Sequence, residues 1–182
     1  MTNIHQFDFS GLRALVRVDF NVPFDDKGQI TDDTRMRAAL PTLRKILSDG
    51  GSVIIATHLG RPKGRDPKLS TALIVPHLKE LIHVPVIHCP VSRGAQAQEM
   101  AQALQSGEIL VLENVRFEEE EEGKLRNADQ YTDEISARSL GTLHRQLHRC
   151  RLFGIRRDDR REVAIDHILL RHMDDILKAK SL

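Results

Sequence analysis

Short apolar runs alternate with amphipathic stretches from Leu12 to Glu113. Runs rich in Val, Ile and Leu predict strands at residues 12–18, 52–57, 84–88 and 108–113. Apolar residues at helical spacing predict helices between these strands, at residues 34–48, from 70 or 71 to 82, and at 94–104. Pro41 lies inside the first of these helices, so that stretch is predicted to form two short helices or one kinked helix.

The regular alternation of strand and helix indicates the fold class. Successive strands joined by helices form a parallel sheet, because each helix crosses back over one face. We therefore predict a doubly wound α/β fold, Rossmann-like, with helices on both faces of the sheet. No repeat of the solenoid type interrupts this pattern.

Residues 138–182 form a tail of different composition. Arg side chains outnumber acidic ones in its first half, and residues 162–179 are predicted to form an amphipathic helix. That helix is expected to pack over the sheet edge, or the Arg-rich stretch acts as a polyanion-binding arm. His144, His148 and Cys150 supply three zinc ligands where structural sites use four, among arginines that repel a cation, so no metal site is predicted.

Composition narrows the function classes. With one Tyr and no Trp, the chain lacks the aromatic side chains on which bases stack, so we expect no nucleic-acid partner. Two cysteines, Cys89 and Cys150, are too few for a disulfide framework, and no basic-then-apolar leader opens the chain. No apolar run approaches the roughly 18 residues that span a bilayer. A cytoplasmic protein that does not enter membranes is therefore expected.

Three predicted loops follow strand ends and carry polar residues. They are residues 19–23, 58–64 and 114–117. In open α/β sheets, ligands bind outside the carboxyl ends of the strands, so these loops are expected to meet. Arg61 and Arg116 would then lie at one edge, joined by Arg35 from the first helix. Several guanidinium groups facing a single carboxylate suit a small anion with more than one negative group.

The same loops carry a family resemblance. Four segments resemble successive signature motifs of phosphoglycerate kinase, in the order of that family: Arg-Val-Asp-Phe-Asn-Val-Pro at 17–23, Thr-Arg-Met-Arg-Ala-Ala at 34–39, His-Leu-Gly-Arg-Pro at 58–62 and Leu-Glu-Asn-Val-Arg-Phe at 112–117. The resemblance covers residues 1 to about 126, and we assign residues 1–137 to the N-terminal, substrate-binding domain of the family. Beyond Asn127 only a Gly-Thr-x-His-Arg segment ending at Arg145 remains similar.

The resemblance implies roles for particular residues. Asp19 and Asn21 would orient the hydroxyl and carboxylate of 3-phosphoglycerate, and Arg35 would be the catalytic residue that meets the transferring group. The complete set that the resemblance implies for substrate binding is Asp19, Phe20, Asn21, Arg35, His58, Leu59, Gly60, Arg61, Arg116 and Arg145.

The implied reaction is phosphoryl transfer between 1,3-bisphosphoglycerate and ADP, which gives 3-phosphoglycerate and ATP with Mg²⁺ bound to the nucleotide. The chain is expected to lack the nucleotide-binding domain, to be inactive alone, and to be a monomer. The alternative is a non-catalytic module that binds anions or polyanions.

Simpler roles compete with these assignments. Asp19 can cap a turn, Gly60 can serve only its loop, and Arg17 can pair with an acidic side chain. The acidic run 118–122 is interpreted as a solvated loop.

Overall fold

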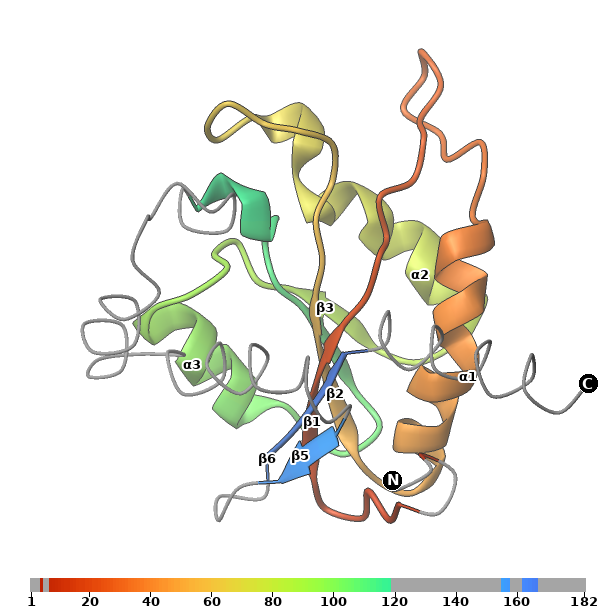
Figure 1. Ribbon diagram of the computed structural model, residues 1–182, viewed down its shortest axis with the longest axis vertical. Coiled ribbons are helices and arrows are strands. Elements are labelled where there is room, and N and C mark those ends of the chain that lie inside the picture. The colour runs from red at the N-terminus through yellow and green to blue at the C-terminus, as the bar shows by residue number, and fades with distance from the viewer. Residues whose placement is uncertain (1–3, 5–6, 119–154, 158–161, 167–182) are drawn as a thin grey trace, which may run out of the picture.

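A six-stranded sheet forms the centre of the protein, with the strand order β3-β4-β2-β1-β6-β5. Figure 1 shows the computed structural model, which describes residues 4, 7–118, 155–157 and 162–166. The strands are β1 (Arg13–Arg17), β2 (Ser52–Ala56), β3 (Val86–His88), β4 (Ile109–Val111), β5 (Ile155–Arg157) and β6 (Glu162–Asp166). All neighbouring strands are parallel except β5 and β6, which are antiparallel. The predicted α/β fold with a parallel sheet is confirmed.

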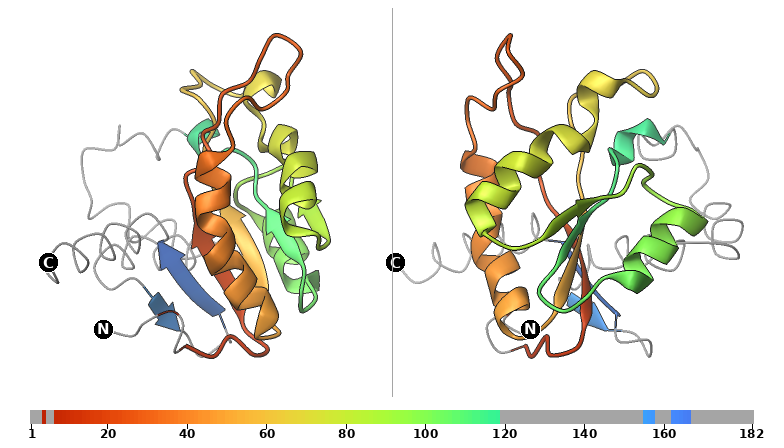
Figure 2. Two further views of the ribbon diagram at one scale, coloured as in Figure 1. Left: turned by 90° about the vertical axis from the view of Figure 1, so that its right-hand side faces the viewer. Right: turned by 180° about the vertical axis from the view of Figure 1, so that it is seen from behind.

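Helices cover both faces of the sheet, as Figure 2 shows from two sides. The α-helices are α1 (Thr34–Ser48), α2 (Val75–Ile82) and α3 (Ala95–Ala103). Short 3-10 helices are η2 (Pro67–Leu69), η3 (Thr71–Ile74) and η4 (Val115–Phe117). Helices α1 and α2 pack on one face and α3 on the other, so the doubly wound arrangement follows from the connections.

The two apolar layers meet at β2, whose five residues are all buried. Successive side chains of a strand point to opposite faces. Val53 and Ile55 accordingly pack with the residues of α1 and α2, whereas Ile54 packs with those of α3. A strand buried on both faces reads as a continuous apolar run rather than an alternating one.

Helix α1 runs unbroken through Pro41. Two short helices were one of the two predictions for this stretch, and that alternative is wrong. Pro41 lacks the N–H that would bond to the carbonyl of Arg37, and both residues are exposed, so water can satisfy that carbonyl. The buried positions Met36, Leu40 and Leu43 recur at helical spacing and hold α1 on the sheet.

The connection from α1 to β2 requires glycine at position 51. A Cβ added to Gly51 would lie 2.9 Å from the carbonyl oxygen of Ile46 and 3.0 Å from that of Phe9. Neither backbone atom can move without disturbing α1 or the segment before β1. The close approach lets β2 begin directly beneath the end of α1.

One prediction for the tail is wrong, the start of the amphipathic helix at residue 162. Residues 162–166, predicted as the start of an amphipathic helix, form β6, which pairs with β1 from Arg13↔Glu162 to Arg17↔Asp166. Val163 and Ile165 fit a period of two as well as a helical face, and the long-range partner β1 decides between them. Residues 167–179 of the predicted helix lie outside the described residues. Within the described part, no helix is long and apolar enough to cross a membrane.

Candidate functional site

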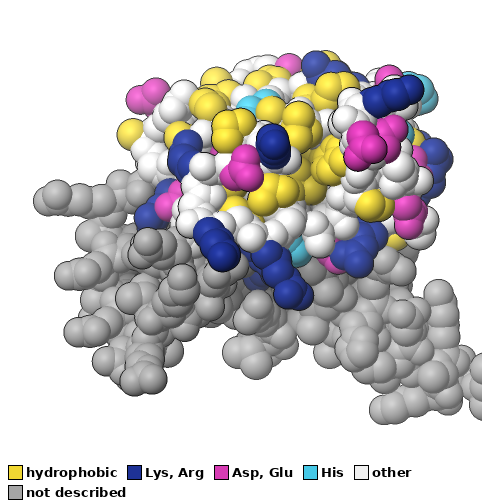
Figure 3. Space-filling view, turned by 90° about the horizontal axis from the view of Figure 1, so that it is seen from above, with side chains coloured by type: hydrophobic (Ala, Val, Ile, Leu, Met, Phe, Trp, Pro, Cys, Tyr) yellow, Lys and Arg dark blue, Asp and Glu magenta, His cyan; other side chains and the backbone are white. Residues whose placement is uncertain are grey.

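The carboxyl ends of β1, β2 and β4 lie at one edge of the sheet because the three strands are parallel. We call the segments beyond these ends, residues 19–22, 57–62 and 113–117, together with Arg35, the rim. They lie at the upper edge of the sheet in Figure 1. Figure 3 looks down on this side of the molecule, where Lys and Arg side chains border a patch of hydrophobic ones.

Two backbone N–H groups join the first rim segment to the second by hydrogen bonds. The N–H of Val18 donates to the carbonyl of Ala56 at 3.1 Å, and the N–H of Phe20 donates to Oγ1 of the buried Thr57 at 3.0 Å. Phe20 itself is fully buried, so its side chain belongs to the core. Asp19 accepts from the N–H of Asn21 at 3.2 Å and closes a local turn. This turn leaves the Asp19 and Asn21 side chains half-buried at the rim.

Gly60 is the point at which the three rim segments contact one another. Its N–H donates to Oδ1 of Asn21 at 2.8 Å, and its carbonyl accepts from Nη1 of Arg116 at 2.7 Å. Its φ of +59° is left-handed, and a Cβ at this position would lie 2.8 Å from Cδ2 of Leu69. Glycine is therefore favoured here by the backbone conformation, and any larger residue would also displace the Leu69 side chain.

Arg35 reaches the rim from the first turn of α1. Its Nη1 forms an ion pair with Oδ2 of Asp19 at 2.5 Å, with side-chain exposures of 53% and 34%. An exposed pair of this kind contributes little to stability, on the order of 0–1 kcal/mol. The guanidinium is consequently available to an incoming anion at small energetic cost.

The remaining predicted residues differ in their surroundings. Arg61 is exposed and forms no hydrogen bond or ion pair with the described residues. His58 is half-buried at the end of β2, and Leu59 is buried, so only its backbone can serve a ligand. Arg145 lies outside the described residues. The structure thus brings nine of the ten predicted residues to one edge of the sheet.

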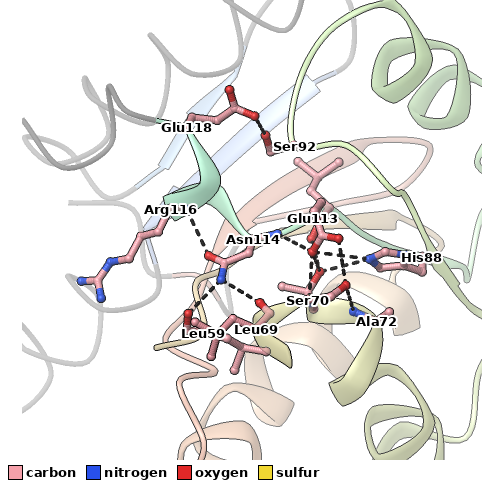
Figure 4. A network of polar contacts seen from close by, with 12 residues as sticks. Leu59, Leu69, Ser70, Ala72, His88, Ser92, Glu113, Asn114, Arg116 and Glu118 are labelled. Carbon is pink, nitrogen blue, oxygen red and sulfur yellow. Dashed lines mark hydrogen bonds and ion pairs between the residues drawn. The ribbon is translucent and has the colours of Figure 1, made fainter. Parts of the chain in front are cut away.

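Asn114 and Glu113 form a buried polar network at the end of β4 that our sequence reasoning did not assign to the site (Figure 4). The Asn114 amide donates from Nδ2 to the carbonyls of Leu59 and Leu69, each at 2.8 Å. The Glu113 carboxylate accepts from the N–H of Asn114 at 2.8 Å and the N–H of Thr71 at 2.9 Å. The sequence signal was present: two polar residues directly follow an apolar strand.

The network keeps Glu113 ionised despite its burial. Burial by itself raises the pKa of Glu113, but hydrogen bonds from Asn114, Thr71 and Ser70 and the nearby His88 outweigh it and lower the pKa below its usual value. Burial lowers the pKa of His88, which the Glu113 charge opposes. His88 contacts Thr71 Oγ1 through Nε2 at 3.1 Å. A neutral imidazole and a charged carboxylate therefore flank Thr71.

Chemically, the rim presents Arg35, Arg61 and Arg116 with one solvent-accessible carboxylate, that of Asp19, because the carboxylate of Glu113 is buried. Guanidinium groups bind phosphate and carboxylate oxygens through paired N–H donors. In the described part of the chain, no group of three or more His, Cys, Asp or Glu side chains gathers in a way that could hold a metal ion. The arrangement suits a small organic anion rather than a metal.

Known proteins resemble this chain at the level of sequence and fold. A family model described as phosphoglycerate kinase matches residues 4–148, which extends past Asn127 and includes Arg145. A phosphoglycerate kinase of Porphyromonas gingivalis is 56% identical over 135 residues, which cover 74% of this chain and 32% of that protein. One of Nostoc punctiforme is 46% identical over 153 residues, covering 80% of this chain and 37% of that protein.

A solved structure agrees with these relatives. The crystal structure of phosphoglycerate kinase from Pyrococcus horikoshii matches with a TM-score of 0.60 and 36% identity, over 72% of this chain and 32% of that one. The chain thus spans about a third of the length of the curated relatives that it matches. With the motifs at the strand ends, the family match and the fold in agreement, the chain belongs to the phosphoglycerate kinase family.

Proposed function

We propose that the rim binds 3-phosphoglycerate and the corresponding end of 1,3-bisphosphoglycerate, so that this chain carries the substrate-binding part of a phosphoglycerate kinase. The observation that carries the proposal is the junction at Gly60, whose N–H donates to Asn21 and whose carbonyl accepts from Arg116, so that three loops form one surface. Arg35 and Arg61 complete a basic surface suited to a phosphate and a carboxylate on one small molecule.

Each side chain has a part in this proposal. Asp19 accepts a hydrogen bond from the substrate hydroxyl, and Asn21 orients the neighbouring carboxylate while it holds Gly60. Arg61 and Arg116, with His58, receive the phosphate. Arg145 is the further cation of this set that the family resemblance implies.

Arg35 is the catalytic residue in this proposal. In phosphoryl transfer the protein mainly positions the reacting groups and stabilises charge on the equatorial oxygens. The Arg35 guanidinium stays charged at any working pH, and its exposed ion pair with Asp19 lets it turn toward the transferring group.

The Mg²⁺-nucleotide is the second substrate that the family resemblance implies. Among the described residues, no three or more His, Cys, Asp or Glu side chains gather in a way that could hold a metal ion. We place the nucleotide in the part of the relatives that this chain does not match, and we expect the chain by itself to show no turnover.

Calorimetric titration of the chain with 3-phosphoglycerate tests the proposal. Charge-assisted hydrogen bonds contribute roughly 1.5–3 kcal/mol each, so Arg35→Ala and Arg116→Ala are each expected to weaken binding about ten- to a hundredfold. Arg44→Ala is the matched control, because Arg44 also lies on α1 but bonds the carbonyl of Leu81 on α2. It is expected to leave the affinity unchanged.

Two results would contradict the proposal. ATP binding as tight as that of 3-phosphoglycerate would place a nucleotide site on this chain. Equal loss of affinity in all three variants, with a steep dependence on salt, would indicate general polyanion binding instead.

A further inference from the structure

Asn114 is fully buried, yet its side chain bonds to three backbone groups, those of Leu59, Leu69 and Arg116. Its Nδ2 donates to the carbonyl of Leu59, where the second loop leaves the sheet, and to that of Leu69, where the loop returns, each at 2.8 Å. Its Oδ1 accepts from the N–H of Arg116 at 3.1 Å. One amide therefore closes the loop of residues 59–69 at both ends and turns the chain toward Arg116.

The orientation of Asn114 is fixed from below by Glu113. Oε1 of Glu113 accepts from the N–H groups of Asn114 and Thr71, and Oε2 accepts from Oγ of Ser70 at 2.8 Å. The segment that follows the loop is thus bound to the same carboxylate as Asn114. Figure 4 shows this continuous set of contacts from His88 to Arg116.

Both partners of the contact between Arg116 and Gly60 depend on Asn114. The backbone N–H of Arg116 donates to Asn114, which fixes the turn from which the Arg116 side chain extends to Gly60. Asn114 also donates to the carbonyl of Leu59, the residue next to Gly60. Because a buried amide has no water to replace a lost partner, these bonds are costly to break.

We propose that Asn114 is a positioning residue for the anion site, which fixes the loop of residues 59–69 so that Arg61 and Arg116 meet the ligand in one geometry. This inference rests on the proposed function, and Asn114 itself touches no substrate. Preorganised cations bind an anion more tightly because less loop and side-chain freedom is lost on binding.

The variants are chosen to remove the two hydrogen bonds from Asn114 to the carbonyls of Leu59 and Leu69, which we call the clamp, and to keep the turn at Arg116. Asn114→Asp has the same shape but no donor for the carbonyls of Leu59 and Leu69. Asn114→Ser is the second variant, which avoids a buried charge and keeps an acceptor for the N–H of Arg116. Ser70→Ala is the control, because it removes a bond of the same network to Glu113 but none to Leu59, Leu69 or Arg116.

Two measurements are made on the full chain: the affinity for 3-phosphoglycerate, and the hydrogen exchange of the Gly60 N–H relative to that of Ile55 in β2. In the Asn114 variants we expect binding to weaken about tenfold, a change of about 1.4 kcal/mol. Exchange of Gly60 should rise at least about tenfold while that of Ile55 changes by the global loss of stability alone. Ser70→Ala should change both by less than about threefold.

The outcomes separate this inference from the function on which it rests. A wild-type chain that does not bind 3-phosphoglycerate overturns the proposed function and the inference with it. Wild-type binding together with unchanged affinity or unchanged Gly60 exchange in Asn114→Ser overturns the inference alone. If neither variant folds, exchange of the Asn114 side-chain amide in the wild type decides: protected protons support the clamp, and freely exchanging ones overturn it.

Discussion

At the scale of single residues, the rim depends on backbone groups as much as on charged side chains. Gly60 contributes an N–H and a carbonyl to the junction of the loops, and Thr57 and Asn114 bind backbone groups of neighbouring segments. The arginines are comparatively exposed, with 53% of the Arg35 side chain accessible. Exposed cations gain specificity when the backbone that carries them is fixed, and buried polar residues do that here.

Glu113 makes the stability of the fold depend on pH. Its pKa in the folded chain lies below the usual value of 4.5, so it contributes stability above that pH and loses it as pH falls through the folded pKa. Glu113→Gln should lower the free energy of unfolding by about 1–3 kcal/mol at pH 7, because the amide replaces one of two acceptors. The difference from wild type should begin to narrow below about pH 4.5, where the carboxyl of the unfolded chain takes up a proton, and should narrow further as pH falls through the lower pKa of the folded chain.

Urea unfolding at pH 7 and pH 4 measures this effect. Glu99→Gln, on the exposed side of α3, is the matched control and should change little at either pH. A Glu113→Gln variant as stable as wild type at pH 7 would show that the network contributes nothing to stability.

At the scale of elements, the sequence pattern predicted those strands and helices whose formation depends mainly on residues within the segment. Strands β1 to β4 and helix α1 form within a residue or two of their expected bounds, because apolar runs and helical spacing are properties of the segments themselves. Strand β6 could not be predicted this way, since its pairing with β1 joins residues far apart in sequence. Likewise, the charged rim residues were identified from motifs, but the bonds of Asn114 to two loop carbonyls depend on tertiary packing.

Deletion of residues 139–182 tests the role of β6. Its loss would leave β1 as an edge strand with unpaired backbone groups, so we expect lower stability and self-association in gel filtration. Affinity of the folded fraction for 3-phosphoglycerate should stay within about threefold, or 0.7 kcal/mol, because the described rim segments follow β1, β2 and β4. Deletion of residues 167–182, which keeps β6, is the control.

If the longer deletion and Arg145→Ala both abolished binding, the segment that ends at Arg145 would be an essential part of the site. The family match, which runs to residue 148, makes that comparison necessary. If the deletion abolished binding and Arg145→Ala did not, the loss would instead be due to disruption of the fold.

At the scale of the whole molecule, one sheet edge carries the rim and the two faces carry the core. Helices α1 and α2 on one face and α3 on the other leave the strand ends open to the loops. The chain spans about a third of the length of its curated relatives, and the function proposed for it concerns the binding of one substrate. The proposed site can be tested on this chain because its described loops contact one another directly.

The most direct test is to locate 3-phosphoglycerate on the chain by titrating a ¹H–¹⁵N spectrum of the full chain. We predict that the largest shifts fall on the backbone amides of Asn21, Gly60 and Arg116 and on the guanidinium of Arg35, and that they saturate together. Largest shifts outside the rim, or no saturable shift at millimolar ligand, would contradict the account.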